Sequence, residues 1–148
     1  MLINTIKSLV TQDLRKLYEE IKLYKNEESI WKVEGNIANS GGNLCLHLIG
    51  NLNTYIGQQI GKTGYVRNRD LEFSLKNVPR EELLRKIDET INVVNTSLDK
   101  LDETDLLTEF PMLVFEEKTS IEYLLVRLST HLSYHLGQVN YHRRLVDR

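Results

Sequence analysis

Apolar residues recur every three or four positions along four stretches of the chain, a spacing that places them on one face of an α-helix. The stretches cover residues 2–25, 40–60, 79–101 and 119–146. The chain contains two prolines, Pro79 and Pro111, and neither interrupts one of these stretches. The pattern therefore predicts four amphipathic helices and an all-α fold.

Residues at the ends of three stretches agree with this prediction. Gly61 follows the second stretch, in the place where a glycine often ends a helix. Pro79 is tolerated in the first turn of the third helix, and Glu81 follows it near the positive end of the helix dipole. The segment Thr119–Glu122, with the sequence TSIE, fits a capping box at the start of the fourth helix.

Four such helices in a chain of this length predict a single domain over residues 1–148, folded as a four-helix bundle. Three connections remain, at residues 26–39, 62–78 and 102–118. All three are longer than usual bundle loops, so they can return the chain along the bundle or wall a pocket. Within them, we expect Trp31 to pack over the core and Pro111–Phe115 to form a short extended piece.

Composition and charge describe an ordinary soluble globular protein. Of the 148 residues, 41% are hydrophobic and 27% are charged, and the formal net charge is −2. This balance argues against a strongly basic nucleic-acid-binding protein. No apolar run reaches the roughly eighteen residues of a membrane span, and residues 1–7 do not resemble a signal peptide. The single cysteine, Cys45, excludes an intrachain disulfide, so we expect a reducing, cytoplasmic location.

The candidate chemistry lies in the four histidines, which are His47, His131, His135 and His142. His131 and His135 are four residues apart on the predicted fourth helix, which leaves them about 40° apart around its axis. Two imidazoles at this spacing can bind one metal ion, as in zinc helices with the sequence His-Glu-x-x-His. Here Leu132 takes the place of the glutamate, so the segment is not a protease helix of that type.

A solvated polar face is the alternative for this histidine pair, but the apolar positions argue against it. Counted from His131, the apolar residues Ile121, Leu125, Leu132 and Val139 gather at about 80–120°, which places both histidines at the border of the buried stripe. The side of the helix that carries these two histidines also carries Arg127, Gln138 and His142. Polar groups beside a core need partners, which a metal ion, a water cluster or a cleft can supply.

His47 lies on the predicted second helix, with Asn43 and Asn51 one turn before and after it. Taken alone, it is interpreted as a core histidine that hydrogen-bonds an asparagine or a backbone carbonyl. If the second and fourth helices face each other, three imidazoles converge instead. Three protein ligands with an open position are the pattern of catalytic zinc sites, and the absence of paired cysteines argues against a structural zinc site.

The run His131–Gln138, with the sequence HLSYHLGQ, resembles the H-x-x-x-H-x-G-Q signature of the DinB-like superfamily, a group of metalloenzymes. In that superfamily the first metal ligand is a histidine near the middle of the second helix, and the segment Asn43–Asn51 has His47 at this position. The resemblance covers nearly the whole chain in helix count, loop lengths and histidine order. The chain looks closest to the branch made of domains of unknown function.

The resemblance implies an up-down-down-up bundle, in which the second and third helices run parallel after the long connection between them. It also implies a divalent metal ion bound by His47, His131 and His135, often in a homodimer. Relatives in the superfamily include transferases that use low-molecular-weight thiols such as bacillithiol, and mycothiol-dependent isomerases. In that chemistry a metal ion lowers the pKa of a thiol or water and produces a nucleophile near neutral pH. Nothing in the sequence indicates DNA binding.

Some neighbours of these histidines have expected roles. Asn51 and Gln138 are candidates to accept the second N–H of a ligating imidazole, and ordinary interhelical hydrogen bonding is the alternative for both. His142 lies two turns beyond His135, roughly 10 Å along the axis, which is too far to share a metal ion. His142 is therefore either a residue that supports a ligand without touching the metal ion or a surface residue, and we prefer the surface interpretation. Tyr134 is expected to face solvent or a partner subunit.

Three further features receive a structural interpretation. Cys45 lies about 200° around the helix from His47, so we expect a buried, unreactive thiol. Arg67 and Arg69 can bind a carboxylate or a phosphate at the mouth of the site, but a charged, solvated loop is the preferred interpretation. Gly137, inside the predicted fourth helix, is expected to allow the close approach of a neighbouring helix.

The hypothesis from the sequence is a metal-dependent enzyme of thiol-transferase or hydrolase type that acts on a small-molecule substrate. Imidazole ligands suit Zn, Ni, Fe and Cu, and the sequence does not choose among them. No Asp or Glu is placed by a motif to act as a general base, which weakens the hydrolase more than the thiol transferase. The alternative is a non-catalytic, dimeric helical bundle whose histidines hold a structural or adventitious metal ion.

Overall fold

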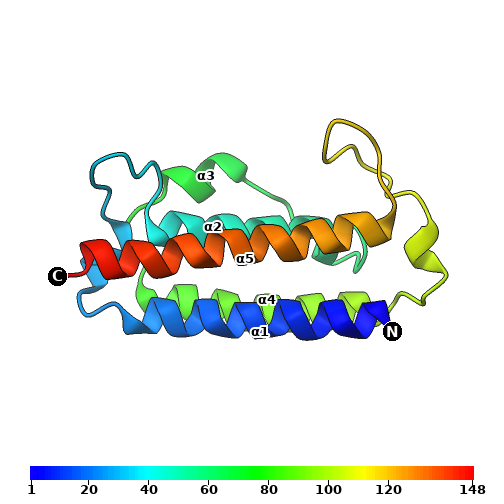
Figure 1. Ribbon diagram of the computed structural model, residues 1–148, viewed down its shortest axis with the longest axis horizontal. Coiled ribbons are helices and arrows are strands. Elements are labelled where there is room, and N and C mark those ends of the chain that lie inside the picture. The colour runs from blue at the N-terminus through cyan, green and yellow to red at the C-terminus, as the bar shows by residue number, and fades with distance from the viewer.

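The structure, a computed structural model, describes residues 1–148, and all its regular secondary structure is helical (Figure 1). Its α-helices are α1 (Leu2–Leu23), α2 (Gly41–Leu52), α3 (Arg69–Ser74), α4 (Arg80–Leu98) and α5 (Ile121–Val146). Short 3₁₀ helices form at Glu27–Trp31 and Asp105–Leu107, and a π-helical turn at Asn53–Gln58 extends α2. The prediction of an all-α chain is confirmed. None of these helices combines the length and the hydropathy needed to cross a lipid bilayer.

Contacts at both ends of α1 and α4 show that these helices run antiparallel. Near the start of α1, the amine of Lys7 pairs with Asp99, which directly follows α4. At the other end, the backbone carbonyl of Lys22 accepts a hydrogen bond from Arg80, the first residue of α4, at 3.1 Å. The pair is the lower layer in Figure 1.

The upper pair, α2 and α5, also runs antiparallel. His47 in the middle of α2 lies beside His131 of α5, and Gly41 at the start of α2 lies beside His142 near the end of α5. The two pairs are joined through α1 and α5, where Glu20 forms an ion pair with Arg143 at 2.8 Å. Both of these residues lie late in their helices, so α1 and α5 run in the same direction (Figure 1).

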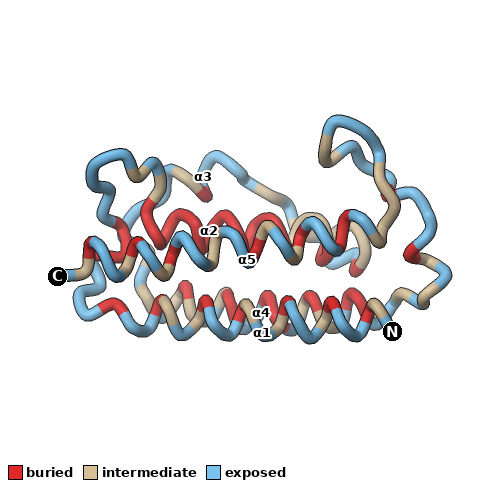
Figure 2. The backbone as a smooth tube through the Cα atoms, in the orientation of Figure 1, coloured by how far each residue is buried: buried red, intermediate tan, exposed pale blue.

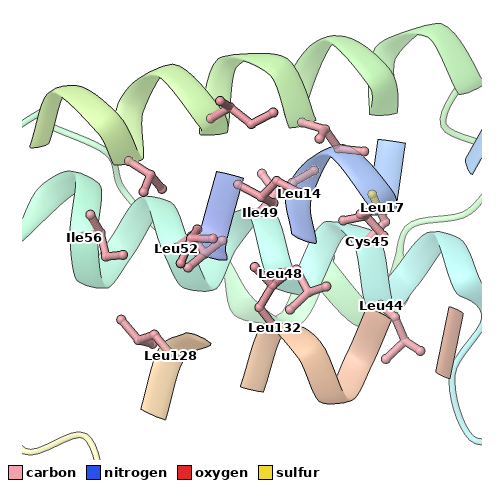
Figure 3. Close-up of a cluster of buried hydrophobic side chains, with 14 of the residues drawn as sticks. Leu14, Leu17, Leu44, Cys45, Leu48, Ile49, Leu52, Ile56, Leu128 and Leu132 are labelled. Atoms are coloured by element: carbon pink, nitrogen blue, oxygen red, sulfur yellow. The ribbon is translucent and has the colours of Figure 1, made fainter. Parts of the chain in front are cut away.

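Buried residues lie on the facing sides of the four long helices (Figure 2). Leu14 and Leu17 of α1 are fully buried and lie against α2, as Figure 3 shows. Every residue of α2 is buried, because α2 packs against α3, α4, α5 and the first 3₁₀ helix. Each buried leucine stabilises the fold by roughly 1.5–3 kcal/mol. Three polar side chains, Asn43, His47 and Asn51, interrupt this central apolar helix one turn apart.

Several expected helix boundaries differ from the structure: α1 ends at Leu23 and α4 at Leu98, before the predicted residues 25 and 101, and two further differences have a visible local cause. The second predicted helix keeps α-helical geometry only to Leu52. The side chains of Asn53 and Thr54 then donate hydrogen bonds to backbone carbonyls one turn earlier, and the next turn is π-helical. At the start of α5, Ser120 is the capping residue, since its Oγ accepts a hydrogen bond from Tyr123 N at 3.1 Å. The cap lies one residue later than the capping box predicted.

One helix was not predicted, because α3 forms within the connection at residues 62–78. Asn68 caps it, with its Oδ1 accepting a hydrogen bond from Leu71 N at 3.3 Å. The helix lies alongside α2 (Figure 1) and buries Glu72 against it. A helix of 6 residues is too short for an apolar period to be visible in the sequence.

The two expectations for the other connections have different outcomes. Trp31 is buried as expected, and its ring lies against Gly42 at the start of α2. The segment Pro111–Phe115 forms no strand. Its flanks instead form one isolated antiparallel bridge, between Glu109 and Ser120, which closes the loop before α5.

Candidate metal centre

Three histidines meet between α2 and α5. His47, in the middle of α2, faces His131 and His135, which lie one turn apart on α5. One ring nitrogen from each histidine lies within 4.8 Å of those of the other two, and the Nε2 atoms of His47 and His131 are 3.2 Å apart. His47 is buried, whereas the other two rings are partly exposed. The fold therefore brings together the three histidines that the sequence singled out.

A carboxylate on α3 orients the ring of His47. Glu72 Oε1 lies 3.0 Å from His47 Nδ1, and the same carboxylate accepts hydrogen bonds from Arg67 Nε at 2.8 Å and Nη2 at 2.9 Å. Burial alone would raise the pKa of Glu72, but the hydrogen bonds from His47 and Arg67 outweigh it and lower the pKa below its usual range. An ionised carboxylate only accepts hydrogen bonds, so His47 Nδ1 carries the proton and its Nε2 lone pair faces the other histidines.

Close packing holds Glu72 in this place. A Cβ atom at Gly50, one turn after His47, would lie 1.9 Å from Glu72 Oε2, so only glycine lets the carboxylate lie against α2. The neighbouring Phe73 packs its ring on that of His47, with 4.9 Å between the centroids. The short helix α3 thus fixes both the tautomer and the rotation of the His47 ring.

The two histidines of α5 have different partners. His135 Nδ1 donates a hydrogen bond to Gln138 Oε1 at 2.6 Å, which leaves its Nε2 free, whereas His131 Nδ1 is buried without any partner. Burial, aided by the imidazoles of His135 and His47, lowers the pKa of His131 to about 4, and burial also lowers the pKa of His135. Both rings are therefore neutral near pH 7, the form that binds a metal ion.

These atoms fit a divalent metal ion. Two nitrogen ligands at about 2.05 Å from a tetrahedral ion lie about 3.3 Å from each other. The Nε2 atoms of His47 and His131 are 3.2 Å apart. Neutral imidazoles suit Zn, Ni and Fe, and three protein ligands leave room for a further one.

Comparison with known proteins identifies a family without an assigned activity. Residues 2–148 match the family described as "Protein of unknown function (DUF1572)". The chain belongs to the DUF1572 family. The expected placement in a family of unknown function is thus confirmed. No curated protein matches the chain.

In this DUF1572 chain, the two residues expected to assist the imidazoles lie differently. Gln138 hydrogen-bonds His135, as described above. Asn51 is buried one turn after His47, but it hydrogen-bonds none of the three imidazoles, and its Oδ1 has no partner. Glu72 occupies the place beside His47 instead. A role for Asn51 and Gln138 in supporting a metal ion stays a prediction.

The interpretation of His142 as a surface residue is wrong. Its side chain is buried, and its Nε2 donates a hydrogen bond to the backbone carbonyl of Lys32 at 2.8 Å. The other nitrogen, Nδ1, therefore accepts a hydrogen bond from the hydroxyl of Tyr24 at 2.6 Å. The segment between α1 and α2 covers this end of α5, and a connection folded over a helix leaves no periodic signal in the sequence.

The interpretation of Arg67 as part of a solvated loop is also wrong. Its guanidinium is partly buried because it forms a two-point ion pair with Glu72, the residue that orients His47. Arg69, by contrast, is exposed as expected. The difference arises from the unpredicted helix α3, which brings a buried carboxylate next to one of the two arginines.

Three other expectations concern Gly137, Cys45 and Tyr134. Gly137 does not mediate close helix packing, because no atom lies within 4 Å of the place where its Cβ would be. Cys45 is buried as expected, and burial raises the pKa of its thiol to about 12, which suppresses the reactive thiolate. Tyr134 is exposed, as expected for a residue facing solvent or a partner.

Reasoning from the sequence missed two residues of the site, Glu72 and Phe73. The available signal was Asn68 followed by Asp70, a capping residue and an acidic residue in the first turn of a helix. That signal places a short helix in the connection. It does not reveal that the helix docks on α2, because docking depends on residues distant in the sequence.

Proposed function

We propose that the chain binds one divalent metal ion (Zn, Ni or Fe) through His47, His131 and His135 and works as a metal-dependent enzyme. The observation that carries the proposal is the convergence of three imidazoles from two helices, with ligand atoms within 4.8 Å of one another. Hydrogen bonds donated to Glu72 and Gln138 hold two of these rings in orientations that leave Nε2 free.

The proposal extends to the fold family. We infer the up-down-down-up four-helix bundle of the DinB-like superfamily for α1, α2, α4 and α5. Two observations support it: α1 and α5 run in the same direction, and each packs on an antiparallel neighbour. A homodimer and a cytoplasmic location belong to the same proposal, and they rest on the family resemblance and the single cysteine.

Residues of the chain prepare the site through a short series of contacts. Arg67 keeps Glu72 ionised, and Glu72 keeps the proton of His47 on Nδ1. Gln138 accepts the Nδ1 proton of His135 in the same way. These contacts stop the rings from rotating and direct their lone pairs inward. A divalent ion bound there supplies Lewis-acid chemistry, which makes a thiol or a water molecule nucleophilic near neutral pH.

The surroundings favour transfer of a thiol over hydrolysis. Activation of water commonly uses a carboxylate or a histidine as a general base. Glu72 is already engaged by His47 and Arg67, and the cavity of about 220 Å³ beside the histidines has no Asp or Glu in its wall. A thiol that has lost its proton needs no further base. We therefore propose a thiol transferase acting on a small-molecule substrate as the first chemistry to test.

The test is the metal content of protein purified without a metal-affinity column. We expect about one divalent ion per chain by elemental analysis, and at least a tenfold loss of bound metal in His131→Ala, which removes one of the three ligands. The matched control is His142→Gln, which alters a histidine of the same helix whose two nitrogens are bonded within the chain. Full metal content in folded His131→Ala would refute the proposal.

A second measurement separates the enzyme from a non-catalytic bundle. The metal-loaded chain is incubated with a low-molecular-weight thiol and an electrophilic acceptor, and consumption of the thiol is followed. We expect consumption by the wild type and none above background by His131→Ala. A metal-loaded wild type that consumes no thiol with any acceptor of a broad panel would favour a structural metal ion instead.

A further inference from the structure

A cavity of about 220 Å³ opens beside the histidine cluster and shares His47 and His131 with it. Three arginines, Arg67, Arg69 and Arg127, come from two distant parts of the chain and line its wall. Arg67 and Arg69 precede and begin α3, while Arg127 lies on α5, one turn before His131. A wall with three guanidinium groups needs an explanation in a chain whose formal net charge is −2.

Each guanidinium lies over an aromatic ring. The pairs are Arg67 with Tyr55 (5.8 Å from the guanidinium carbon to the ring centroid), Arg69 with Phe73 (5.2 Å) and Arg127 with Phe115 (5.2 Å). Stacking occupies the flat face of a guanidinium and leaves its N–H edge available for hydrogen bonds in the plane. The rings thus hold the arginines in defined positions without consuming their donors.

The charges in the cavity are not balanced by the chain. Glu72 neutralises Arg67, but neither Arg69 nor Arg127 forms an ion pair. The wall contains no Asp or Glu, although Glu116 and Glu117 directly follow Phe115 in the chain. Two unpaired guanidinium groups therefore remain at the cavity, next to His47 and His131. Planar N–H donors of this kind bind carboxylate and phosphate oxygens.

Apolar side chains complete the wall. Val114 and Phe115 from the loop before α5 and Leu128 from α5 line the cavity together with the arginines. Its volume of about 220 Å³ is below the roughly 300–1,000 Å³ of pockets for drug-sized ligands. The cavity therefore fits a small molecule, or one end of a larger one, that carries an anionic group and an apolar part.

We infer that this cavity binds the carboxylate or phosphate group of a small, partly apolar substrate through Arg69 and Arg127, and so places the rest of that substrate beside the three histidines. The inference rests on the proposed function, whose substrate class it specifies. Arg67 contributes by holding Glu72, whereas Arg69 and Arg127 have donors free for the ligand. Binding at this position brings an anionic substrate within reach of the metal centre.

The experiment uses three probes that share a phenyl group: phenylacetate, phenyl phosphate and the neutral phenylacetamide. Each is titrated into the full chain, with and without zinc, and the dissociation constant is measured by calorimetry at one fixed ionic strength. We expect at least one of the two anions to bind tenfold or more tightly than the amide, because the amide lacks the charge that the guanidinium groups recognise. Comparison of the two anions shows whether the cavity prefers a carboxylate or a phosphate group.

Substitutions of the arginines test whether the preference for anions arises in this cavity. Arg69→Gln and Arg127→Gln are each expected to weaken binding of the preferred anion about fivefold, and the double variant more, with zinc content unchanged. Arg85→Gln is the matched control, since Arg85 lies exposed on α4, away from the cavity, and should leave the dissociation constant unchanged. Circular dichroism verifies that each variant is folded.

Failure of this inference and failure of the proposed function give different results. Equal binding of anions and amide, or full anion affinity in the double variant, overturns the inference while a stoichiometric zinc ion still supports the metal centre. Conversely, the chain could bind no zinc and still show an anion preference that depends on Arg69 and Arg127. That result would support anion binding in the cavity and refute the proposed metal centre.

Discussion

At the scale of single residues, Glu72 and Gly50 together determine how His47 is presented. Glu72 hydrogen-bonds His47 Nδ1 and receives two hydrogen bonds from Arg67. It reaches this position only because Gly50 has no side chain: a Cβ there would lie 1.9 Å from Glu72 Oε2. A backbone position on α2 thereby controls the chemistry of an imidazole one turn earlier on the same helix.

Gly50→Ala should therefore weaken metal binding without removing a ligand. The added methyl group displaces Glu72, and His47 loses the acceptor that orients its ring. Loss of such a partner typically lowers metal affinity about 10–100-fold. The measurement is competition for zinc with a chromogenic chelator.

Gly137→Ala is the matched control, because no atom lies within 4 Å of its added Cβ. It should keep the zinc affinity and raise the free energy of unfolding by about 0.5–1 kcal/mol, as alanine is favoured over glycine inside a helix. Wild-type zinc affinity in Gly50→Ala would show that Glu72 does not tune the site.

At the scale of elements, the short helix α3 depends on its packing against α2. Helices as short as its 6 residues are not stable in isolation. Asn43 of α2 holds its end, with Nδ2 donating to the backbone carbonyls of Glu72 at 3.0 Å and Leu75 at 2.9 Å. The asparagine that precedes His47 by one turn thus fixes the element that carries the partner of His47.

Asn43→Ala should release α3 from α2. One buried and one partly buried hydrogen bond to the backbone disappear, so we expect a loss of about 2 kcal/mol in the free energy of unfolding and weaker zinc binding. Hydrogen exchange should accelerate at residues 69–74, the span of α3. Chemical denaturation and the zinc competition assay measure the other two effects.

Asn95→Ala provides the comparison, since Asn95 is also an interhelical amide, hydrogen-bonded to Thr11 across α1 and α4. It should lower stability by about 1 kcal/mol and leave zinc affinity unchanged. If both variants lose zinc affinity equally, general destabilisation rather than the docking of α3 controls the site.

At the scale of the whole molecule, contacts between distant segments close both ends of the helical layers. At one end, the backbone N–H of Ile3 donates to Glu103 at 3.3 Å. At the other, Asn26 N donates to Asp147 at 3.1 Å, and the buried His142 joins Tyr24 to the backbone of Lys32. The two hydrogen bonds of His142 make stability depend on the protonation of one histidine outside the candidate metal centre.

His142 should make the chain less stable in mild acid. Burial lowers its pKa below the ordinary value of 6.5, although the hydrogen bond to Lys32 and the charge of Glu34 oppose this. Between the folded-state pKa and about 6.5, the unfolded chain binds more protons than the folded chain. The contribution of the neutral ring is therefore fully present above about pH 6.5 and is lost as the pH falls through this window.

The measurement compares urea denaturation of the metal-free wild type and His142→Gln from about pH 7.5 to pH 5. We expect the free energy of unfolding to fall less steeply with acid in the variant, which lacks the titrating ring. The three histidines of the metal centre are present in both proteins, so their titration cancels in the difference. If the free energy of unfolding falls equally steeply with acid in both proteins, the pH dependence does not arise from His142.

Much of the helical structure and part of the site could be predicted from the sequence. Four stretches of helical period became the four long helices, and the spacing of His131 and His135 placed both rings on one face of α5. These features depend on residues within one or two turns of each other, and the helical period records such relations directly.

Only the tertiary structure decided which of these side chains meet. The contact of His47 with His131 joins residues 84 positions apart, that of His47 with Glu72 spans 25, and that of Tyr24 with His142 spans 118. No local period encodes such distances, because they depend on how helices pack and where connections fold back. The sequence by itself therefore determined the helices and the candidate ligands, whereas packing decided that the imidazoles converge, that Glu72 orients one of them, and that His142 is buried.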